Sequence, residues 1–263
     1  MPAPNPAYRP LLHRPVLSIQ DAAAAYSGNR RAAAQALYTL QRSGLLVKVR
    51  RGLYVPGPRQ DPAWETNWNP YLVAARLRPE ATLAFHSALV IAGVAHNPSE
   101  SRVHVAVSSR FSPFSFQGVR FEPHLMPARL MEKASSAYPH EGEVIRATRP
   151  EWTITMCCRH PSKGAGFEEI AQSSSGFRRI SAPEVFDACQ AIGTSSIFNR
   201  AGFLLSLNRG EWGIKPNELN PFRERMSGSP VYFGERSERS LYVREWRLFV
   251  PRSAREVAGL GRD

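Results

Sequence analysis

Side chains that could read DNA bases recur on one predicted helix, residues 30–43. Arg31 and Gln35 are spaced so that they lie one turn apart on the same helix face. Arginine can donate paired hydrogen bonds to guanine, and glutamine can pair in the same way with adenine. Ala34 between them is small enough to let a helix approach the bases closely. The spacing therefore predicts base contacts from Arg31 and Gln35 and a phosphate contact from Arg30.

A second group of cations surrounds a predicted tight turn at Gly52. The apolar runs 45–49 and 53–55 are typical of two short strands, and Arg50-Arg51-Gly52 joins them as a hairpin. A basic hairpin of this kind can lie along a phosphate backbone or enter a minor groove, although a solvated structural hairpin is the alternative. The predicted DNA-contacting residues are Arg30, Arg31, Gln35, Tyr38, Arg42, Lys48, Arg50 and Arg51.

Patterns that mark common enzyme classes do not occur in the sequence. It contains no G-x-x-x-x-G-K-[ST] phosphate loop, no G-x-S-x-G elbow and no H-E-x-x-H zinc motif. His86 stands beside Ser87 but has no visible third catalytic group, so we expect it in the core. His104 alternates within a predicted strand and could equally face solvent. We therefore predict no catalytic residue, no metal ligand and no cofactor.

The positive charge is concentrated at the N-terminal end of the chain. The whole sequence has a net charge of +12, and residues 1–59 hold nine Lys and Arg residues against a single acidic residue, Asp21. The remaining segments, 60–150 and 151–263, are close to balanced. A local field of this sign attracts a polyanion such as double-stranded DNA.

The elements that carry these cations follow the order of a winged helix-turn-helix. Ser18 with Asp21 predicts the start of a first helix, and Ser27-Gly28-Asn29 predicts a turn. The second helix runs from about residue 30 to 43, with Asn29 as its cap and Gly44 after its end. Four of its apolar residues form a stripe opposite Arg31 and Gln35; they are Ala33, Ala36, Leu37 and Leu40.

The rest of the chain predicts a mixed, helix-rich domain. Residues 60–70 have the composition of a linker, and residues 111–118 look like a turn that carries three phenylalanines. Helices are expected at 70–77, 87–93, 151–159, 166–173, 182–192 and 195–208, and strands at 81–85, 102–107, 119–121, 231–233 and 246–250. The fold class is therefore α+β, with a winged helix-turn-helix at 1–59 and an α+β domain at 60–263.

Composition favours a cytoplasmic protein. The chain has no apolar run long enough to span a membrane, and its N-terminus lacks the cationic flank and apolar core of a secretory signal. Cys157, Cys158 and Cys189 have no spacing that suits zinc or a local disulfide, so we expect buried free thiols.

The order and spacing of several segments resemble the AbiEi family, the winged-helix antitoxins of type IV toxin–antitoxin systems. The resemblance is carried by LQRSGLLVKVRRGLYV at 40–55, NPYLVAARL at 69–77, ATLAFHSALVIAGV at 81–94, RPEWTITMCCRHP at 149–161 and TSSIFNRAGFLLSL at 194–207. It covers roughly residues 16–250.

The resemblance implies a repressor that binds inverted repeats in its own operon and counteracts a co-encoded nucleotidyltransferase-like toxin. The antitoxin activity would reside after residue 59, and direct toxin binding is left open. Because the sequence shows no heptad run, we expect a monomer that pairs on DNA. Two alternatives remain: a free-standing transcription factor whose second domain senses a small molecule, and a nuclease guided by the N-terminal domain.

Overall fold

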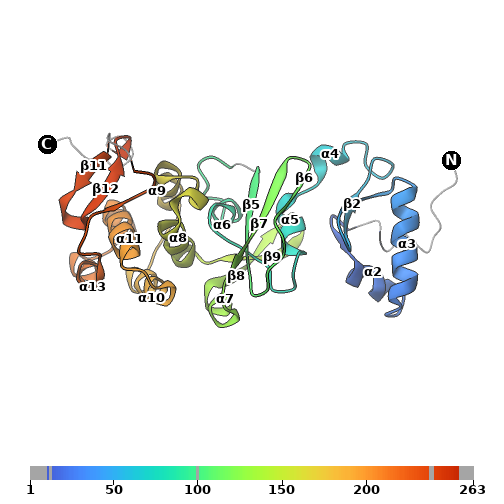
Figure 1. Cartoon of the computed structure of the whole chain (residues 1–263), viewed down its shortest axis with the longest axis horizontal. Helices are drawn as coiled ribbons and strands as arrows, with labels where there is room; N and C mark the ends of the chain where they lie inside the picture. The colour runs from blue at the N-terminus through green and yellow to red at the C-terminus, as the bar shows by residue number, and fades with distance from the viewer. Residues whose placement is uncertain (1–10, 12–13, 99–100, 237–239, 255–263) are drawn as a thin grey trace.

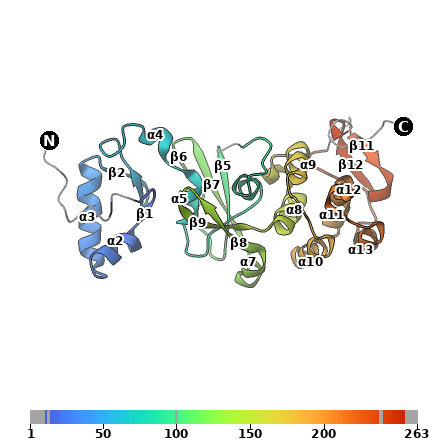
Figure 2. The same ribbon diagram turned by 180° about the vertical axis from the view of Figure 1, so that it is seen from behind.

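The structure is a computed structural model that describes residues 11, 14–98, 101–236 and 240–254. Helices and strands mix along the chain, which agrees with the predicted α+β class. Figure 1 shows an elongated molecule with the N-terminal elements at one end, a β-sheet in the middle and helices followed by a small sheet at the other end. The view from behind in Figure 2 has the same order.

Two capped helices follow the first short strand of the chain. Helix α2 (Ile19–Ala25) starts at Ser18, whose hydroxyl accepts a hydrogen bond from the backbone N–H of Asp21. Helix α3 (Arg30–Arg42) starts at Asn29, whose side-chain oxygen accepts from the N–H groups of the second and third helical residues. Gly44 follows α3 with φ +74°, a left-handed conformation that glycine adopts at little cost. Both predicted caps are confirmed.

A basic hairpin follows α3 and pairs with the strand that precedes α2. Strands β2 (Leu46–Arg50) and β3 (Leu53–Pro56) are antiparallel, and β1 (Leu17–Ser18) pairs with the other edge of β3, so the order is β1-β3-β2. Gly52 has φ +79°, and its carbonyl accepts a 2.9 Å hydrogen bond from the backbone N–H of Ile19. This bond fixes the hairpin tip beside the start of α2.

The hairpin contributes to two buried clusters. The predicted stripe of α3 packs with α2 and β2, and this cluster contains Leu11, Leu17, Ala22, Ala23, Ala33, Ala36, Leu37, Leu40 and Leu46. Val49, Leu53 and Val55 instead join the cluster that covers one face of the central sheet. The first 59 residues therefore share apolar contacts with the rest of the chain, and the domain boundary at residue 59 stays a prediction.

The central sheet has six strands in the order β6-β7-β5-β4-β9-β8. Its strands are β4 (Thr82–Leu83), β5 (Arg102–Val107), β6 (Phe114–Phe116), β7 (Val119–Leu125), β8 (Ser135–His140) and β9 (Glu143–Thr148). β5 and β7 are parallel, as are β4 and β9, and the other pairs are antiparallel. Around the sheet lie α4 (Trp64–Asn67), α5 (Pro70–Ala75), α6 (His86–Ile91) and α7 (Ala128–Ala134).

The sheet differs from the expected elements at two hairpins. Residues 111–118 are not simply a turn, because β6 lies within them and pairs with β7. The hairpin of β8 and β9, with α7 before it, falls where the sequence analysis assigned no element. The predicted linker at 60–70 contains α4, and after it Trp68 packs edge-on against Phe116 with ring centroids 4.9 Å apart.

The helical half matches the predicted periodicity more closely. Its elements are α8 (Pro150–Arg159), η2 (Pro161–Gly164), α9 (Phe167–Ser175), α10 (Ala182–Ile192), α11 (Ser195–Leu207), α12 (Arg209–Trp212), η3 (Pro216–Leu219) and α13 (Asn220–Arg225). A small sheet ends the described chain, with β10 (Val231–Tyr232), β11 (Ser240–Val243), η4 (Arg244–Trp246) and β12 (Leu248–Pro251). The three cysteines are buried free thiols, as predicted. No helix in the described ranges is long and apolar enough to cross a membrane.

Candidate functional site

The outward face of α3 presents the predicted base-reading residues to solvent. Arg31 and Gln35 are both exposed, and Tyr38 on the same face exposes 56% of its surface. Arg30 and Arg42 are exposed at the two ends of the helix. Figures 1 and 2 both place α3 at the N-terminal extremity of the molecule, with the hairpin on its inner side. The face is therefore open to a large ligand.

Charge around α3 is almost entirely positive. The helix has no acidic residue in its first turn, where Arg30 and Arg31 stand instead. Cations at a helix N-terminus face the positive end of the helix dipole, an arrangement that costs about 0.3–1 kcal/mol for each. Asp21 does not offset them, because its carboxylate is 2.7 Å from the Arg14 guanidinium and 3.6 Å from that of Arg76. An anion bound from outside the chain would lower the electrostatic repulsion at this helix terminus.

The three hairpin cations lie in different environments. Lys48 and Arg51 are exposed, as a contact with phosphates requires. Arg50 is half-buried, and its guanidinium lies 5.4 Å from the ring centre of Phe111 and 5.0 Å from that of Phe114. Burial, and then the nearby charge of Arg78, lowers the pKa of Arg50 below its usual value. Arg50 therefore joins the hairpin to the central sheet, whereas Lys48 and Arg51 face outward.

Phe111 also lines a cavity of about 650 Å³. Its lining combines apolar side chains such as Met126 and Met156 with three cations, Arg110, Arg159 and Lys163. The lining also includes two imidazoles and no carboxylate. The lining of this cavity is therefore basic, which suits a small anion better than an apolar ligand.

Histidines gather around Phe85 at the wall of this cavity. The Phe85 ring centre lies 4.8 Å from that of His124, 5.6 Å from that of His104 and 6.1 Å from that of His160. Phe85 itself has φ +54°, a strained backbone conformation for a bulky residue. His104 is only 3% exposed, so the alternative that it faces solvent is wrong.

The environment keeps two of these imidazoles neutral. Burial, and then the charge of Lys163, lowers the pKa of His104 to about 3 and that of His124 to about 3. Because the charged form of each imidazole is disfavoured, both rings are uncharged at pH 7 and keep a lone pair on one nitrogen. The sequence analysis missed this cluster, since its histidines come from the two strands β5 and β7 and from the junction between α8 and η2.

His86 is buried at the start of α6, in agreement with the sequence analysis. Its Nε2 lies 3.3 Å from a carboxylate oxygen of Glu169 on α9. Glu169 also accepts hydrogen bonds from the backbone N–H groups of His96 and Asn97, and the Ser87 hydroxyl accepts one from the His104 N–H. These contacts join α6, α9 and β5, and they give the Ser87 hydroxyl a structural role.

Comparisons with known proteins bear on the fold. A scan against protein-family models and a search of curated proteins each find no match. Among solved structures, the chain is similar to the crystal structure of the RV2827C protein from Mycobacterium tuberculosis, with a TM-score of 0.61 and 14% sequence identity. The similarity covers 94% of this chain and 92% of that one. At this identity it shows a shared fold, and the resemblance to the AbiEi family stays a prediction.

Proposed function

We propose that the chain is a sequence-specific DNA-binding repressor that reads the major groove with α3. The observation that supports this proposal most directly is the exposed face of α3 at the end of the molecule. On this face Arg31 and Gln35 lie one turn apart, and the helix has no acidic residue. In a winged helix-turn-helix a first strand pairs with the distal strand of the hairpin, and here β1 pairs with β3. That topology supports α3 as the recognition helix and the hairpin as the wing.

The electrostatics of the N-terminal elements support the same proposal. Arg30 and Arg31 occupy a helix terminus that favours anions, and a sequence that breaks such a local rule often does so at a functional site. A single module of this size buries about 600–1,000 Å² on DNA, which is little for tight repression. Two copies on an inverted repeat would double that area, so we expect pairing on the operator.

The test is a comparison of specific and scrambled duplexes. Sequences selected from a random duplex pool by the wild-type chain provide the operator. Arg31→Ala and Gln35→Ala are each expected to weaken operator binding by about 1–3 kcal/mol and to relax preference at one base pair, with a smaller effect on the scrambled duplex. Arg179→Ala is the matched control, since it removes an exposed arginine between α9 and α10. Equal losses on both duplexes would show that these residues do not read bases.

The resemblance to AbiEi antitoxins supports a second part of the proposal. The repressor would belong to a two-gene operon and counteract a nucleotidyltransferase-like toxin, with residues after 59 providing the protection. The full chain and its Arg31→Ala variant are expressed beside the neighbouring toxin gene, driven from a promoter that the chain does not control. Equal protection of growth by both is expected. Loss of protection with Arg31→Ala would mean that the protein acts by repression alone.

The cavity favours one alternative, a repressor that responds to a small anion. Phe111 lines the cavity and also packs against Arg50 of the hairpin, so an occupant that shifts Phe111 would move the wing. A thermal-shift screen with phosphate- and carboxylate-bearing small molecules tests this alternative. We expect a compound that raises Tm and changes operator affinity, with both effects lost in Leu130→Trp, which fills the cavity. Absence of any stabilising anion would contradict it.

A further inference from the structure

Parallel pairing of two central strands brings three potential metal ligands together. In the register of β5 with β7, His104 lies opposite Glu122, and Ala106 lies opposite His124. Because alternate residues of a strand point to the same face, His104, Glu122 and His124 share one face of the sheet. Lys163 of η2 reaches this face at His124, whereas Val103, Val105 and Phe121 point to the other face and join its buried cluster.

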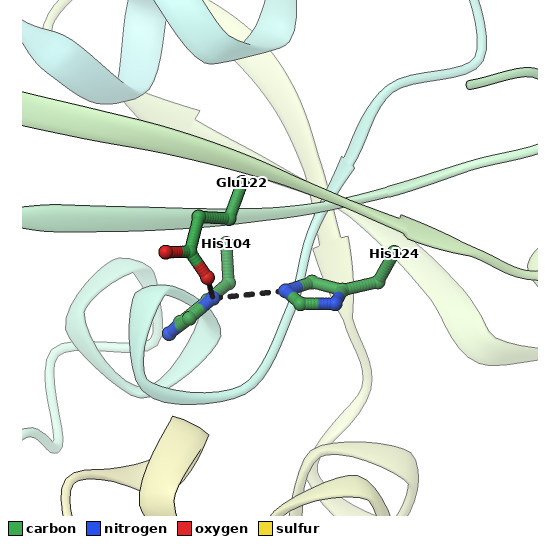
Figure 3. A group of neighbouring side chains, drawn as sticks. All are labelled: His104, Glu122 and His124. Carbon is green, nitrogen blue, oxygen red and sulfur yellow. Dashed lines mark hydrogen bonds and ion pairs between the residues drawn. The ribbon is translucent and has the colours of Figure 1, made fainter. Parts of the chain in front are cut away.

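The three side chains converge on one point. His104 Nδ1 lies 2.9 Å from His124 Nε2 and 3.8 Å from Glu122 Oε2. All three ligand atoms are within 4.8 Å of one another. Figure 3 shows the two rings and the carboxylate turned toward the same small space. Within the described residues, no other group of three His, Cys, Asp or Glu side chains meets this condition.

Neighbouring side chains hold the cluster in this orientation. The other carboxylate oxygen of Glu122, Oε1, lies 3.1 Å from Arg120 Nε and 3.6 Å from Arg102 Nε. Oε2 is thereby left facing the imidazoles. The far nitrogen of His124, Nδ1, lies 3.1 Å from Lys163 Nζ, so Nε2 is the nitrogen turned inward. The two arginines, one step out from Glu122, are partners of the kind that orient metal ligands in proteins. Lys163 can only donate, so it could not accept the Nδ1–H that a zinc-bound His124 carries.

We propose that His104, Glu122 and His124 form a binding site for Zn²⁺. Two imidazole nitrogens and one carboxylate oxygen are a common zinc ligand set, with a fourth position left for water. Zinc bonds of this type put two ligand atoms about 3.3 Å apart in a tetrahedron. The nitrogens, 2.9 Å apart, must therefore separate, and the carboxylate oxygen, 3.8 Å from His104 Nδ1, must move closer. His124 lines the cavity, which supplies the path for the ion. Mg²⁺ prefers oxygen ligands and does not suit this site.

A hydrogen-bonded chain is the competing account of the same geometry. Lys163 would donate to His124 Nδ1, and His124 Nε2–H would donate to His104 Nδ1, with no ion involved. The two accounts assign opposite roles to Lys163. In the hydrogen-bonded arrangement the Lys163 ammonium supports the cluster, whereas beside a zinc ion its positive charge opposes binding.

The experiment titrates the tag-free, chelator-treated full-length chain with Zn²⁺ against a chromophoric competitor, with Mg²⁺ as the comparison ion. One Zn²⁺ per chain is expected, and His124→Ala and Glu122→Gln each weaken binding at least tenfold. His140→Ala leaves it unchanged, because this imidazole pairs with Asn69 and with none of the three ligands. Lys163→Met binds about tenfold more tightly because it removes the nearby positive charge.

Folding defects cannot imitate this set of results. Glu122→Gln is nearly isosteric, circular dichroism and the melting temperature check each variant, and a tighter Lys163→Met has the opposite sign to any loss of structure. The proposal is overturned if the wild-type chain takes up no Zn²⁺ at micromolar free ion, or if His124→Ala binds Zn²⁺ as tightly as the wild type. It is also overturned if Lys163→Met weakens binding, since the hydrogen-bonded chain would then account for the cluster.

Discussion

The double variant Lys48→Ala, Arg51→Ala probes the contribution of the hairpin to DNA binding. Both side chains are exposed and Gly52 fixes the turn beside them, so their removal leaves the buried hairpin residues in place. Each phosphate contact contributes about 0.9 to the slope of log affinity against log salt. Loss of two contacts should therefore lower the slope by about 1.8. Over a fourfold rise in salt, from 50 to 200 mM, the variant should lose about 12-fold less affinity than the wild type.

Fluorescence anisotropy with a labelled operator duplex at several salt concentrations measures this slope. The matched control is Arg178→Ala, Arg179→Ala, which removes two exposed cations between α9 and α10. Its slope should equal that of the wild type. Arg50 is left unchanged, because its packing against Phe111 and Phe114 would confuse a charge effect with a loss of structure. A hairpin variant with the wild-type slope would refute phosphate contact by Lys48 and Arg51.

Three further predictions concern the N-terminal elements. Asn29→Ala should lower the free energy of unfolding by about 1 kcal/mol in urea, and Asn29→Ser should restore most of it, since serine also caps a helix. Leu37→Ala should cost about 2–5 kcal/mol in the same assay, because Leu37 is fully buried in α3. Burial alone would raise the pKa of Asp21, but hydrogen bonds from Ser18 and the charges of Arg76 and Arg14 lower it overall. The Asp21 carboxylate therefore stabilises the fold above about pH 3.9, its pKa in the unfolded chain, and this contribution is lost as the pH falls below that value. The difference in the free energy of unfolding between wild type and Asp21→Asn should be constant from pH 5 to 7 and shrink below pH 4.

Local signals explain why α3 could be predicted. Asn29, the apolar stripe and Gly44 act within a few residues of one another, and each favours the same helix. The hairpins of the central sheet were harder to predict. The turns Gln117-Gly118 and Glu141-Gly142 both have positive φ at both positions, as a type I′ turn requires. Glutamine and glutamate rarely occupy the first position, so the usual Asn-Gly or Asp-Gly signal was missing.

Long-range contacts explain what the sequence could not provide. The approach of His104 to His124 depends on the parallel pairing of β5 with β7, and Lys163 reaches them from η2. The packing of Arg50 on the sheet likewise depends on how the hairpin docks against β6. No local pattern specifies these distances, whereas the charge and spacing of the α3 face could be predicted because they lie within one helix.

The most direct test of the central claim is the position of α3 on DNA. Gln41 is exposed at the edge of the α3 face, and Gln41→Cys would add an accessible thiol to a chain whose three described cysteines are buried. Burial raises the pKa of Cys158 to about 12, which suppresses labelling there. A hydroxyl-radical-generating iron chelate attached at residue 41 should cut the selected operator within each half-site, while the same reagent at Arg179→Cys should not. Cleavage from residue 179, or none from residue 41 with operator bound, would contradict the account.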